Sequence, residues 1–300
     1  AIGGDLVLNA TAGDVDGNGA VTVGGAINFD ATGNVGFGSL AANGGAFTAN
    51  AGGDINFAGA TSANNIDFTA VGSINGGDLT AANALNLNGG NIAIGDASAS
   101  AMNFASASNI LFNMLTSPNA ITLTAASGTV GMNIGSGDIN SGGDINLTAQ
   151  AINVGNLTST ANIAATATVG DASFGTVDAG TDITISAIGT PTVTNAISGG
   201  NTSITGASVT LNNGAIGGDL VLNATAGDVD GNGTVTVGGG INLDATGDVG
   251  FRDLDAQGGR FTVNAGGNIN FTSATSSDDM ALNAGGGMNG GDIDAGGAMM

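Results

Sequence analysis

The sequence predicts an all-β fold, a right-handed parallel β-helix (β-solenoid) with about 19–20 residues and three short strands per turn. Three observations predict it: a long repeat of 214 residues, a five-residue phrase that recurs about every 19.5 residues within it, and Gly, Asn and Asp between the phrases. Periods of this size are typical of stacked arrays. Because one such unit cannot bury its apolar face alone, neighbouring units must cover one another.

The long repeat is visible by direct alignment. Residues 215–300 can be laid on residues 1–86 without a gap, and residues 1–19 recur unchanged as residues 215–233. We expect residues 1–214 to be a first long repeat of eleven solenoid turns, and residues 215–300 to begin a second one, continuous with the first in one rod. Since the chain opens without Met and closes inside a repeat, we also expect it to be a segment of a much longer polypeptide.

The five-residue phrase reads apolar, any residue, apolar, polar, small. Its period of two is typical of a strand with one buried face. The phrase begins at Leu6, Ile27, Phe47, Ile66, Leu85, Met102, Ile121, Ile145, Ile163, Ile183, Thr202 and, where the count restarts, Leu220.

Two further short runs with the same alternation follow each phrase. In the unit that starts at Ile27 they are residues 34–37 and 39–42, and Gly, Asn and Asp separate the runs from their neighbours. We therefore expect three strands per turn around a core of roughly triangular section. Each strand should pair in parallel with its equivalent in the next turn.

The two copies of the long repeat differ in a way that supports this assignment. At positions predicted to face inward, every exchange stays apolar, whereas positions predicted to face outward drift freely. The inward pairs are Phe29 and Leu243, Ile66 and Met280, Phe68 and Leu282, Ile74 and Met288, and Leu79 and Ile293; the outward pairs are Gly38 and Arg252, Ser39 and Asp253, Ala41 and Asp255, and Ala46 and Arg260.

Composition excludes several classes of function. The net charge is -22 with only two cationic side chains, Arg252 and Arg260, so we expect no nucleic-acid partner. No apolar run reaches the length of a membrane span, so we expect no membrane insertion. The absence of Cys excludes disulfides and thiolate metal sites. The chain also lacks His, Lys, Glu and Tyr, which removes most general acids, bases and nucleophiles, and we expect no enzyme activity.

The sharpest local motif is DVDGNG, at residues 14–19 and again at residues 228–233. Its oxygen-bearing residues at positions 1, 3 and 5, followed by Gly, match the first half of a calcium-binding loop. The ligands would be Asp14, Asp16 and Asn18 with their copies Asp228, Asp230 and Asn232. However, the position of the bidentate Glu is Gly25 or Gly239, so a tight turn between strands is the other interpretation. Calcium is accordingly the one cofactor we consider.

Other features have weaker functional interpretations. A column of hydroxyls at phrase position 4 suggests an ice-binding array or simply good strand residues. Asp253 and Asp255 accompany the two Arg residues, and local charge neutralisation explains this group as well as a binding role does. The longest spacing places extra residues at 131–143, which are either a projecting contact or a neutral insertion.

The runs GGDINLTAQAINVGNLTSTANI from Gly142 and AGGDINFAGATSANNIDFTA from Ala51 resemble the repeat regions of filamentous-haemagglutinin-type adhesins. These are very large Gram-negative surface proteins exported by two-partner secretion. The resemblance implies an extracellular rod that passes unfolded through an outer-membrane transporter barrel and folds turn by turn outside.

From the resemblance we expect an extracellular stalk segment at the bacterial cell surface that mediates attachment to surfaces, cells or a biofilm matrix. The alternative is a structural polymer, such as a sheath, surface-layer or matrix filament, with self-association of the rods into filaments. The two differ in what removal of the protein does: loss of attachment in the first case, and loss of a visible layer in the second.

Overall fold

The computed structural model describes residues 1–132 and 137–300, and these form strands and connecting turns with no helix among them. Contacts between residues divide the chain into two units, Ala1–Val154 and Gly155–Met300. In each unit, parallel strands about 19 residues apart in sequence stack on one another. The predicted fold class, a parallel β-solenoid, is confirmed.

The phrases form one strand per solenoid turn, which we call phrase strands. Within each unit they pair in chain order into a parallel sheet. In the first unit they are β1 Leu6–Ala10, β4 Ile27–Ala31, β6 Phe47–Ala51, β8 Ile66–Ala70, β10 Ala84–Gly89, β13 Ala101–Ser106, β16 Ile121–Ala125 and β19 Ile145–Ala149. In the second unit they are β22 Ile163–Ala167, β24 Ile183–Ala187, β26 Thr202–Gly206, β28 Leu220–Ala224, β30 Ile241–Ala245, β32 Phe261–Ala265 and β34 Met280–Ala284.

The return path of each turn carries the other two predicted strands. In the first unit these are β2 Val15–Gly17, β3 Val21–Val23, β5 Val35–Ala42, β7 Ile55–Ser62, β9 Ser73–Ala81, β11 Asn91–Ala93, β12 Ala97–Ser98, β14 Ile110–Phe112, β15 Met114–Ser117, β17 Thr129–Met132, β18 Asp138–Ser141 and β20 Ala151–Val154. In the second unit they are β21 Leu157–Ser159, β23 Ala172–Ala179, β25 Pro191–Ser198, β27 Val209–Ile216, β29 Val229–Val237, β31 Val249–Ala256, β33 Ile269–Ser276 and β35 Met288–Ala295.

In many turns the second and third strands merge into one element of eight or nine residues. The bend between them persists as a shift in the alternation: in β5 both Phe37 and Leu40 are buried, with Gly38 and Ser39 between them. Phe37 therefore faces the core from one side of the bend and Leu40 from the other. The two inward faces meet at an angle, as a triangular section requires.

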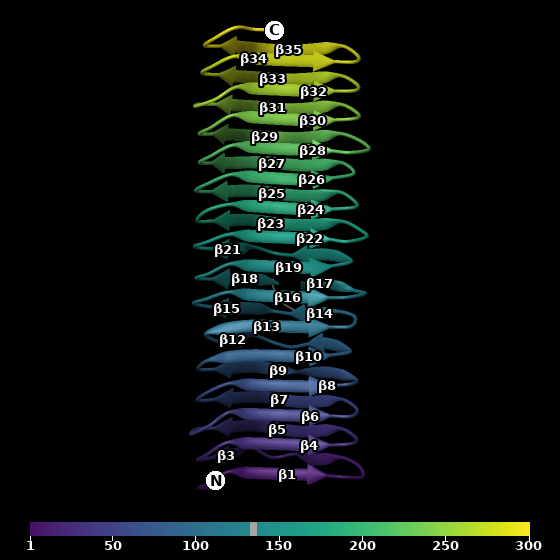
Figure 1. The fold of residues 1–300 in the computed structure, drawn as a ribbon, viewed down its shortest axis with the longest axis vertical. Coiled ribbons are helices and arrows are strands. Elements are labelled where there is room, and N and C mark those ends of the chain that lie inside the picture. The colour runs from purple at the N-terminus through teal and green to yellow at the C-terminus, as the bar shows by residue number, and fades with distance from the viewer. Residues whose placement is uncertain (133–136) are drawn as a thin grey trace. The chain divides into compact units, whose positions relative to one another are not determined.

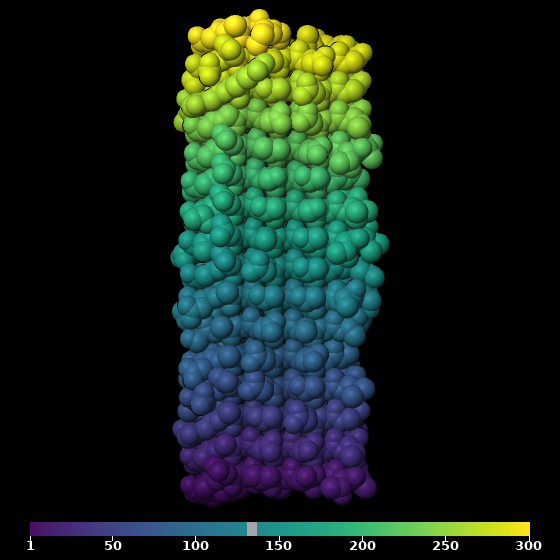
Figure 2. Space-filling view, viewed as in Figure 1, coloured from purple at the N-terminus to yellow at the C-terminus, as the bar shows by residue number. Residues whose placement is uncertain are grey.

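Within a unit the chain climbs steadily from one turn to the next (Figure 1). The phrase strands run across the front of the view and the return strands run behind them in the opposite direction, which makes the coil right-handed. Figure 2 shows the side chains of successive turns in contact, layer upon layer, on the phrase face. The junction of the two long repeats, between Gly214 and Ala215, lies inside β27. This strand pairs in parallel with β25 before it and β29 after it, and its register with β29 shifts between Thr210 and Gly214.

The core is a stack of aliphatic and aromatic side chains from the inward positions. In the first unit Phe29, Phe37, Phe47, Phe57 and Phe68 form a continuous aromatic cluster with ring centroids 4.9–6.0 Å apart. Edge-to-face and offset contacts at these distances add to the gain from burial. The first-copy members of the five inward pairs, Phe29, Ile66, Phe68, Ile74 and Leu79, are buried, whereas Leu6 and Leu8 of the first phrase are partly exposed.

In the second copy the predicted inward side chains Leu243 and Met280 are buried, but Met288 is 61% exposed. Met288 lies on β35, over which no further turn is stacked in this chain. Its side-chain position on the sheet is still the one that the copy predicts, because it pairs with Ile269 as Ile74 pairs with Ile55.

Candidate functional site

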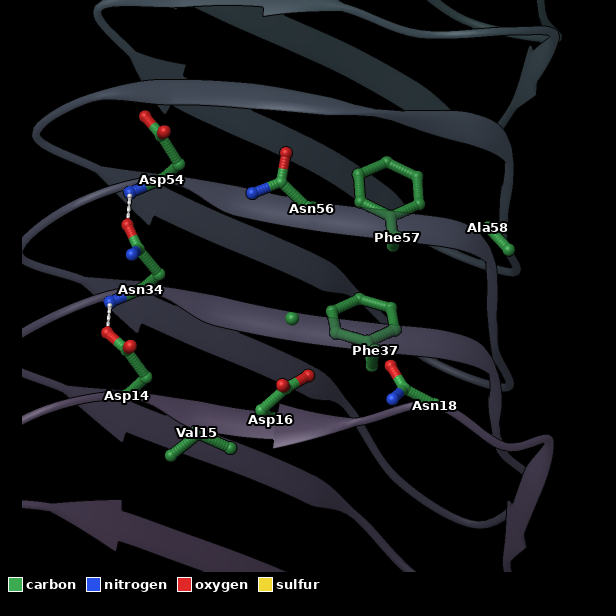
Figure 3. Close-up of a pocket in the computed structure, with 11 residues that line it drawn as sticks. Asp14, Val15, Asp16, Asn18, Asn34, Phe37, Asp54, Asn56, Phe57 and Ala58 are labelled. Carbon is green, nitrogen blue, oxygen red and sulfur yellow. Dashed lines mark hydrogen bonds between the residues drawn. The ribbon is translucent and has the colours of Figure 1, made fainter.

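The first and last residues of the return path lie at corners of the solenoid, where Asp and Asn side chains form ladders. At the corner after the phrase strand, Asp14 Oδ1 accepts a hydrogen bond from the Asn34 backbone N–H at 2.6 Å. Asn34 Oδ1 accepts one from Asp54 N–H at 2.8 Å (Figure 3). Asp54 Oδ1 in turn accepts one from Ser73 N–H at 2.7 Å. Each side chain thus reaches from one solenoid turn to the backbone of the next.

The residue whose N–H donates to the side-chain oxygen is preceded by a glycine, because a Cβ at that position would occupy the space of the oxygen. A Cβ built on Gly53 would overlap Asn34 Oδ1, and the same overlap occurs between Gly33 and Asp14 Oδ1. The Gly-Asp and Gly-Asn pairs that recur along the sequence therefore form one repeated structural motif that links neighbouring solenoid turns. The Gly admits the side chain from the turn below, and the Asx residue reaches to the turn above.

The second copy repeats this ladder. Asp228 Oδ1 accepts from Asp248 N–H at 2.7 Å, and Asp248 Oδ1 accepts from Asn268 N–H at 2.6 Å. Asp14 and Asp228, the first residues of the two DVDGNG motifs, thus hold successive turns together. Each bond joins residues 20 apart in the chain, so the Asp side chain links neighbouring solenoid turns and does not form the local Asx turn of the tight-turn interpretation.

The other two corners carry ladders of the same kind. Before the phrase strand, Asp182 Oδ1 accepts from Asn201 N–H at 2.7 Å, and Asn201 Oδ1 accepts from Asp219 N–H at 2.8 Å. At the bend of the return path, Asp78 Oδ1 accepts from Asp96 N–H at 2.9 Å. The sequence signal that could have revealed the ladders is the Gly before nearly every such Asx residue.

Asp16 and Asn18 are exposed and line a groove on the outside of the first unit, together with the ladder residues Asp14, Asn34 and Asp54 (Figure 3). The groove has a volume of about 540 Å³ and is open to solvent. It arises from a missing side chain: Asp16 pairs with Gly36, and Gly36 pairs with Asn56, so the outward column has a gap between Asp16 and Asn56.

The second copy has the corresponding gap at Gly250, between Asp230 and Asn270. Asp230 and Asn232 line this groove of about 430 Å³, which differs from the first by the presence of Arg252 at its edge. Burial raises the pKa of the Asp230 carboxyl, and the neighbouring carboxylates of Asp228 and Asp248 raise it further. The fold therefore binds the proton of Asp230 more tightly than the unfolded chain does.

The motif residues do not curl around a common point as they would in a calcium-binding loop. Val15–Gly17 is the extended strand β2, and Val229–Val237 is the continuous strand β29. Alternate residues of a strand are about 6.6 Å apart, whereas oxygens bound to one Ca²⁺ lie about 2.3–2.6 Å from it. Among the described residues no three acidic, His or Cys side chains are grouped as a metal site. Calcium binding by Asp14, Asp16, Asn18, Asp228, Asp230 and Asn232 stays a prediction.

The remaining candidates are placed as follows. Arg252 Nε lies 3.4 Å from Asp253 Oδ2; the arginine is exposed and the aspartate half-buried, and the pair fits local charge neutralisation. The hydroxyl column occupies the outward positions of the phrase strands, as at Thr124 and Thr205. Residues 133–136 of the expected contact at 131–143 lie outside the described residues.

Buried serines are the polar residues that sequence reasoning missed in the core. Ser62, at the end of β7, donates from Oγ to Gly45 O at 2.9 Å and accepts from Asn64 N–H at 3.1 Å. Ser276, at the end of β33, donates to Gly259 O at 3.2 Å in the same way. These side chains close the third corner of their turns and have a structural role.

No family model, curated protein or solved structure matches the chain. In the part of the chain that the structure describes, no helix is long and apolar enough to cross a membrane.

Proposed function

We propose that this chain is an extracellular β-solenoid stalk segment of a giant bacterial surface adhesin. The observation that carries the proposal is the use of its polar side chains: within each unit, the corner Asp and Asn residues bond one turn to the next. A chain whose most regular polar side chains hold its turns together is suited to act as a spacer between the cell and a binding site. Stability in such arrays is approximately a sum over turns and their interfaces, so length can grow without a new core.

The comparison of the two copies supports a spacer. The exchanges Gly38 to Arg252 and Ser39 to Asp253 change charge on the outer surface, while the buried Phe37 and Phe251 are kept. A receptor-binding surface that had to be repeated would hold its outward residues constant. A stalk has to keep only apolar residues at its inward positions and Asp or Asn at its corners, as the pairs Phe29 and Leu243, and Asn34 and Asp248, do.

Export is part of the proposal. A Cys-free chain forms no disulfide that would obstruct unfolded passage through an outer-membrane transporter barrel, and local stacking allows it to fold turn by turn outside. Partners on the cell, surface or matrix side would then be bound by other parts of the adhesin.

The experiment is an in-frame deletion that shortens the stalk and preserves the stacking. Removing residues 20–233 joins Gly19 to Thr234 in the same phase of the long repeat, because residue 233 is the copy of residue 19. A matched control removes residues 20–224, which joins Gly19 to Thr225 out of phase. Both alleles are expressed in place of the natural gene, beside a complete deletion.

For a stalk, complete deletion abolishes attachment of cells and leaves the surface layer intact in electron micrographs. The in-phase deletion retains surface display with reduced attachment, and the out-of-phase deletion loses display. Loss of a visible sheath or layer on complete deletion would favour the structural polymer instead. Unchanged attachment and unchanged ultrastructure would contradict both.

A further inference from the structure

Each of the two outward grooves, at Gly36 and at Gly250, centres on a glycine that the fold does not require. The ladder glycines Gly33 and Gly53 leave no space for a Cβ. A Cβ on Gly36 or Gly250, by contrast, meets only the end of a flexible aspartate side chain, at 3.1 or 3.0 Å, and neither glycine has a positive φ. Glycine weakens the interior of a strand, and one of its uses there is to admit a ligand close to the backbone.

The gap is a property of the repeat. The strand that carries Gly250, β31, pairs with β29 in the turn before it and with β33 in the turn after it, and β29 in turn pairs with β27. In the outward column, Asp230 lies one turn before the glycine and Asn270 one turn after it, the same order as around Gly36. The same gap thus arises in both long repeats.

The polar residues around the glycine are kept between the two copies. They are Asp16 and Asp230, Asn18 and Asn232, and Asn56 and Asn270. Farther along the same return strands the outward residues differ, as with Ser39 and Asp253 or Gly59 and Ser273. The outward column at the groove is therefore more constant than the surface beside it.

The charge of the groove is not kept. The residues that line the first groove include three carboxylates, Asp14, Asp16 and Asp54, and no cation. The residues that line the second groove include one carboxylate, Asp230, and the cation Arg252. A site for an ion would depend on this charge. Because the two grooves share hydrogen-bonding groups and differ in charge, they favour an uncharged ligand.

The shared groups fit a ligand that is rich in hydroxyls. An Asp carboxylate only accepts hydrogen bonds, whereas an Asn amide donates and accepts them. A hydroxyl group can do both, so it can bond to either kind of side chain.

The edges of phenylalanine rings supply an apolar contact in each groove. Phe37 and Phe57 line the first groove, beside Asp16 and Asn56 (Figure 3), and they are 8 and 7% exposed. Phe251 lines the second groove and is 5% exposed. A few polar groups next to an apolar surface are typical of small-molecule sites. A sugar ring matches this combination, because it has hydroxyls at its rim and C–H groups on its faces.

From these observations we propose that each outward groove binds a pyranose residue of an uncharged polysaccharide. The sugar hydroxyls bond to the Asp and the two Asn side chains that the copies share, and the ring contacts the exposed phenylalanine edge. The groove volumes of about 540 and 430 Å³ lie within the usual range for such sites, about 300–1,000 Å³. This binding goes beyond the proposed spacing role of the chain and does not depend on it.

The test titrates the full chain with uncharged tetrasaccharides of glucose, mannose, galactose and N-acetylglucosamine. NMR follows the side-chain NH₂ signals of the asparagines, which report each groove separately. We expect at least one tetrasaccharide to bind in the millimolar range and to shift the signals of Asn56 and Asn270. The signal of Asn88, which is exposed on the phrase strand β10, should stay in place.

Filling one gap should remove one site and spare the other. Gly250→Asn places an amide next to Asp230, an arrangement that the fold accepts elsewhere, since Asn264 Nδ2 donates to Asp244 Oδ1 in the next turn at 2.7 Å. We expect this variant to weaken binding at Asn270 by at least about tenfold. The shift of Asn56 should be unchanged, which also shows that the variant is folded.

A matched control places the same side chain outside the groove. In Gly59→Asn, the new Cβ meets Asp78 O at an ordinary 3.5 Å, and the second copy already carries Ser273 at this position. Both shifts should persist in this variant. Loss of either shift in Gly59→Asn would contradict the assignment of the site to the grooves.

A donor test separates a sugar from a cation. Asn270→Asp removes the NH₂ donor and adds a negative charge, so it should weaken binding of the tetrasaccharide, followed at Asn232. Stronger binding in this variant, or binding only of a glucosamine tetramer with protonated amines, would overturn the proposal in favour of a cation. No shift with any of the uncharged tetrasaccharides would overturn it, and so would a shift at Asn270 that persists in Gly250→Asn.

Discussion

Replacing Asn34 and Gly53 by alanine, singly and together, tests the corner ladder, because the stability losses of the two single variants should not add in the double variant. Asn34→Ala removes the acceptor of the 2.8 Å bond from Asp54 N–H, and a net hydrogen bond of this kind contributes about 1 kcal/mol. Gly53→Ala places a methyl group where Asn34 Oδ1 lies, so the side chain must leave its position. That costs the same bond and about 0.5–1.5 kcal/mol of rotamer strain.

The double variant should be more stable than the sum predicts. Once Asn34 is alanine, the methyl group at position 53 meets only ordinary contacts, the nearest being Gly33 C at 3.4 Å. It then lowers the entropy of the unfolded chain, which is worth about 0.4–1 kcal/mol. We expect losses of about 1 and 1.5 kcal/mol for the single variants and about 0.5 kcal/mol or less for the double variant.

The assay is native-state hydrogen exchange of the amides in β5 and β7, which reports local free energies of opening. A local readout is preferable because long repeat arrays lose two-state cooperativity. Independent sites add within about 0.5 kcal/mol. A double variant as unstable as the sum of the singles would therefore refute the steric and hydrogen-bonding role assigned to this pair.

Three further outcomes are expected. Phe47→Ala removes a fully buried ring at the centre of the aromatic cluster and should cost about 3–5 kcal/mol in the same exchange measurement, whereas Thr48→Ala on the outer face should cost less than about 0.5 kcal/mol. Because the raised pKa of Asp230 means that the fold binds its proton more tightly, stability from this group is lost as pH rises above its ordinary value of 3.8. Asp230→Asn should therefore raise the denaturant midpoint at pH 7 and not below pH 3.8; an equal gain at both pH values would contradict this. Millimolar Ca²⁺ should leave Tm unchanged if the motif at residues 14–19 serves only to link solenoid turns, and a rise in Tm abolished by Asp16→Asn would establish the calcium interpretation instead.

The strand pattern was predictable because the alternation of the phrase has one physical cause, burial of one face. The phrase strands begin at the predicted residue or one residue before it, as at Ala84 for the phrase from Leu85. The merging of the second and third strands into β5 was not predictable. The pairing of β5 with β7 skips Gly38 but continues in parallel on both sides of it, and alternation alone does not distinguish a bent strand from two short ones.

The residues of the ladders are visible in the sequence as alternating Asp and Asn, but the hydrogen bonds that these side chains make are not. The alternation of Asp and Asn at residues 182, 201 and 219 is equally explained by separation of like charges, and only coordinates show the backbone N–H that each oxygen accepts. The groove at Gly36 was hidden for a different reason. It depends on which residue of the next turn lies opposite Asp16, and the unit length varies from turn to turn.

Cross-linking of engineered cysteines tests the parallel, one-turn register most directly, because the chain has no Cys of its own. Asn28 and Thr48 are partners on adjacent phrase strands, about 4.8 Å apart, within reach of a disulfide. Asn28 and Asn50 are offset by two residues, roughly 8 Å apart, and out of reach. The account predicts that oxidation closes a disulfide in Asn28→Cys/Thr48→Cys and not in Asn28→Cys/Asn50→Cys. Closure of the second pair, or of neither, would contradict it.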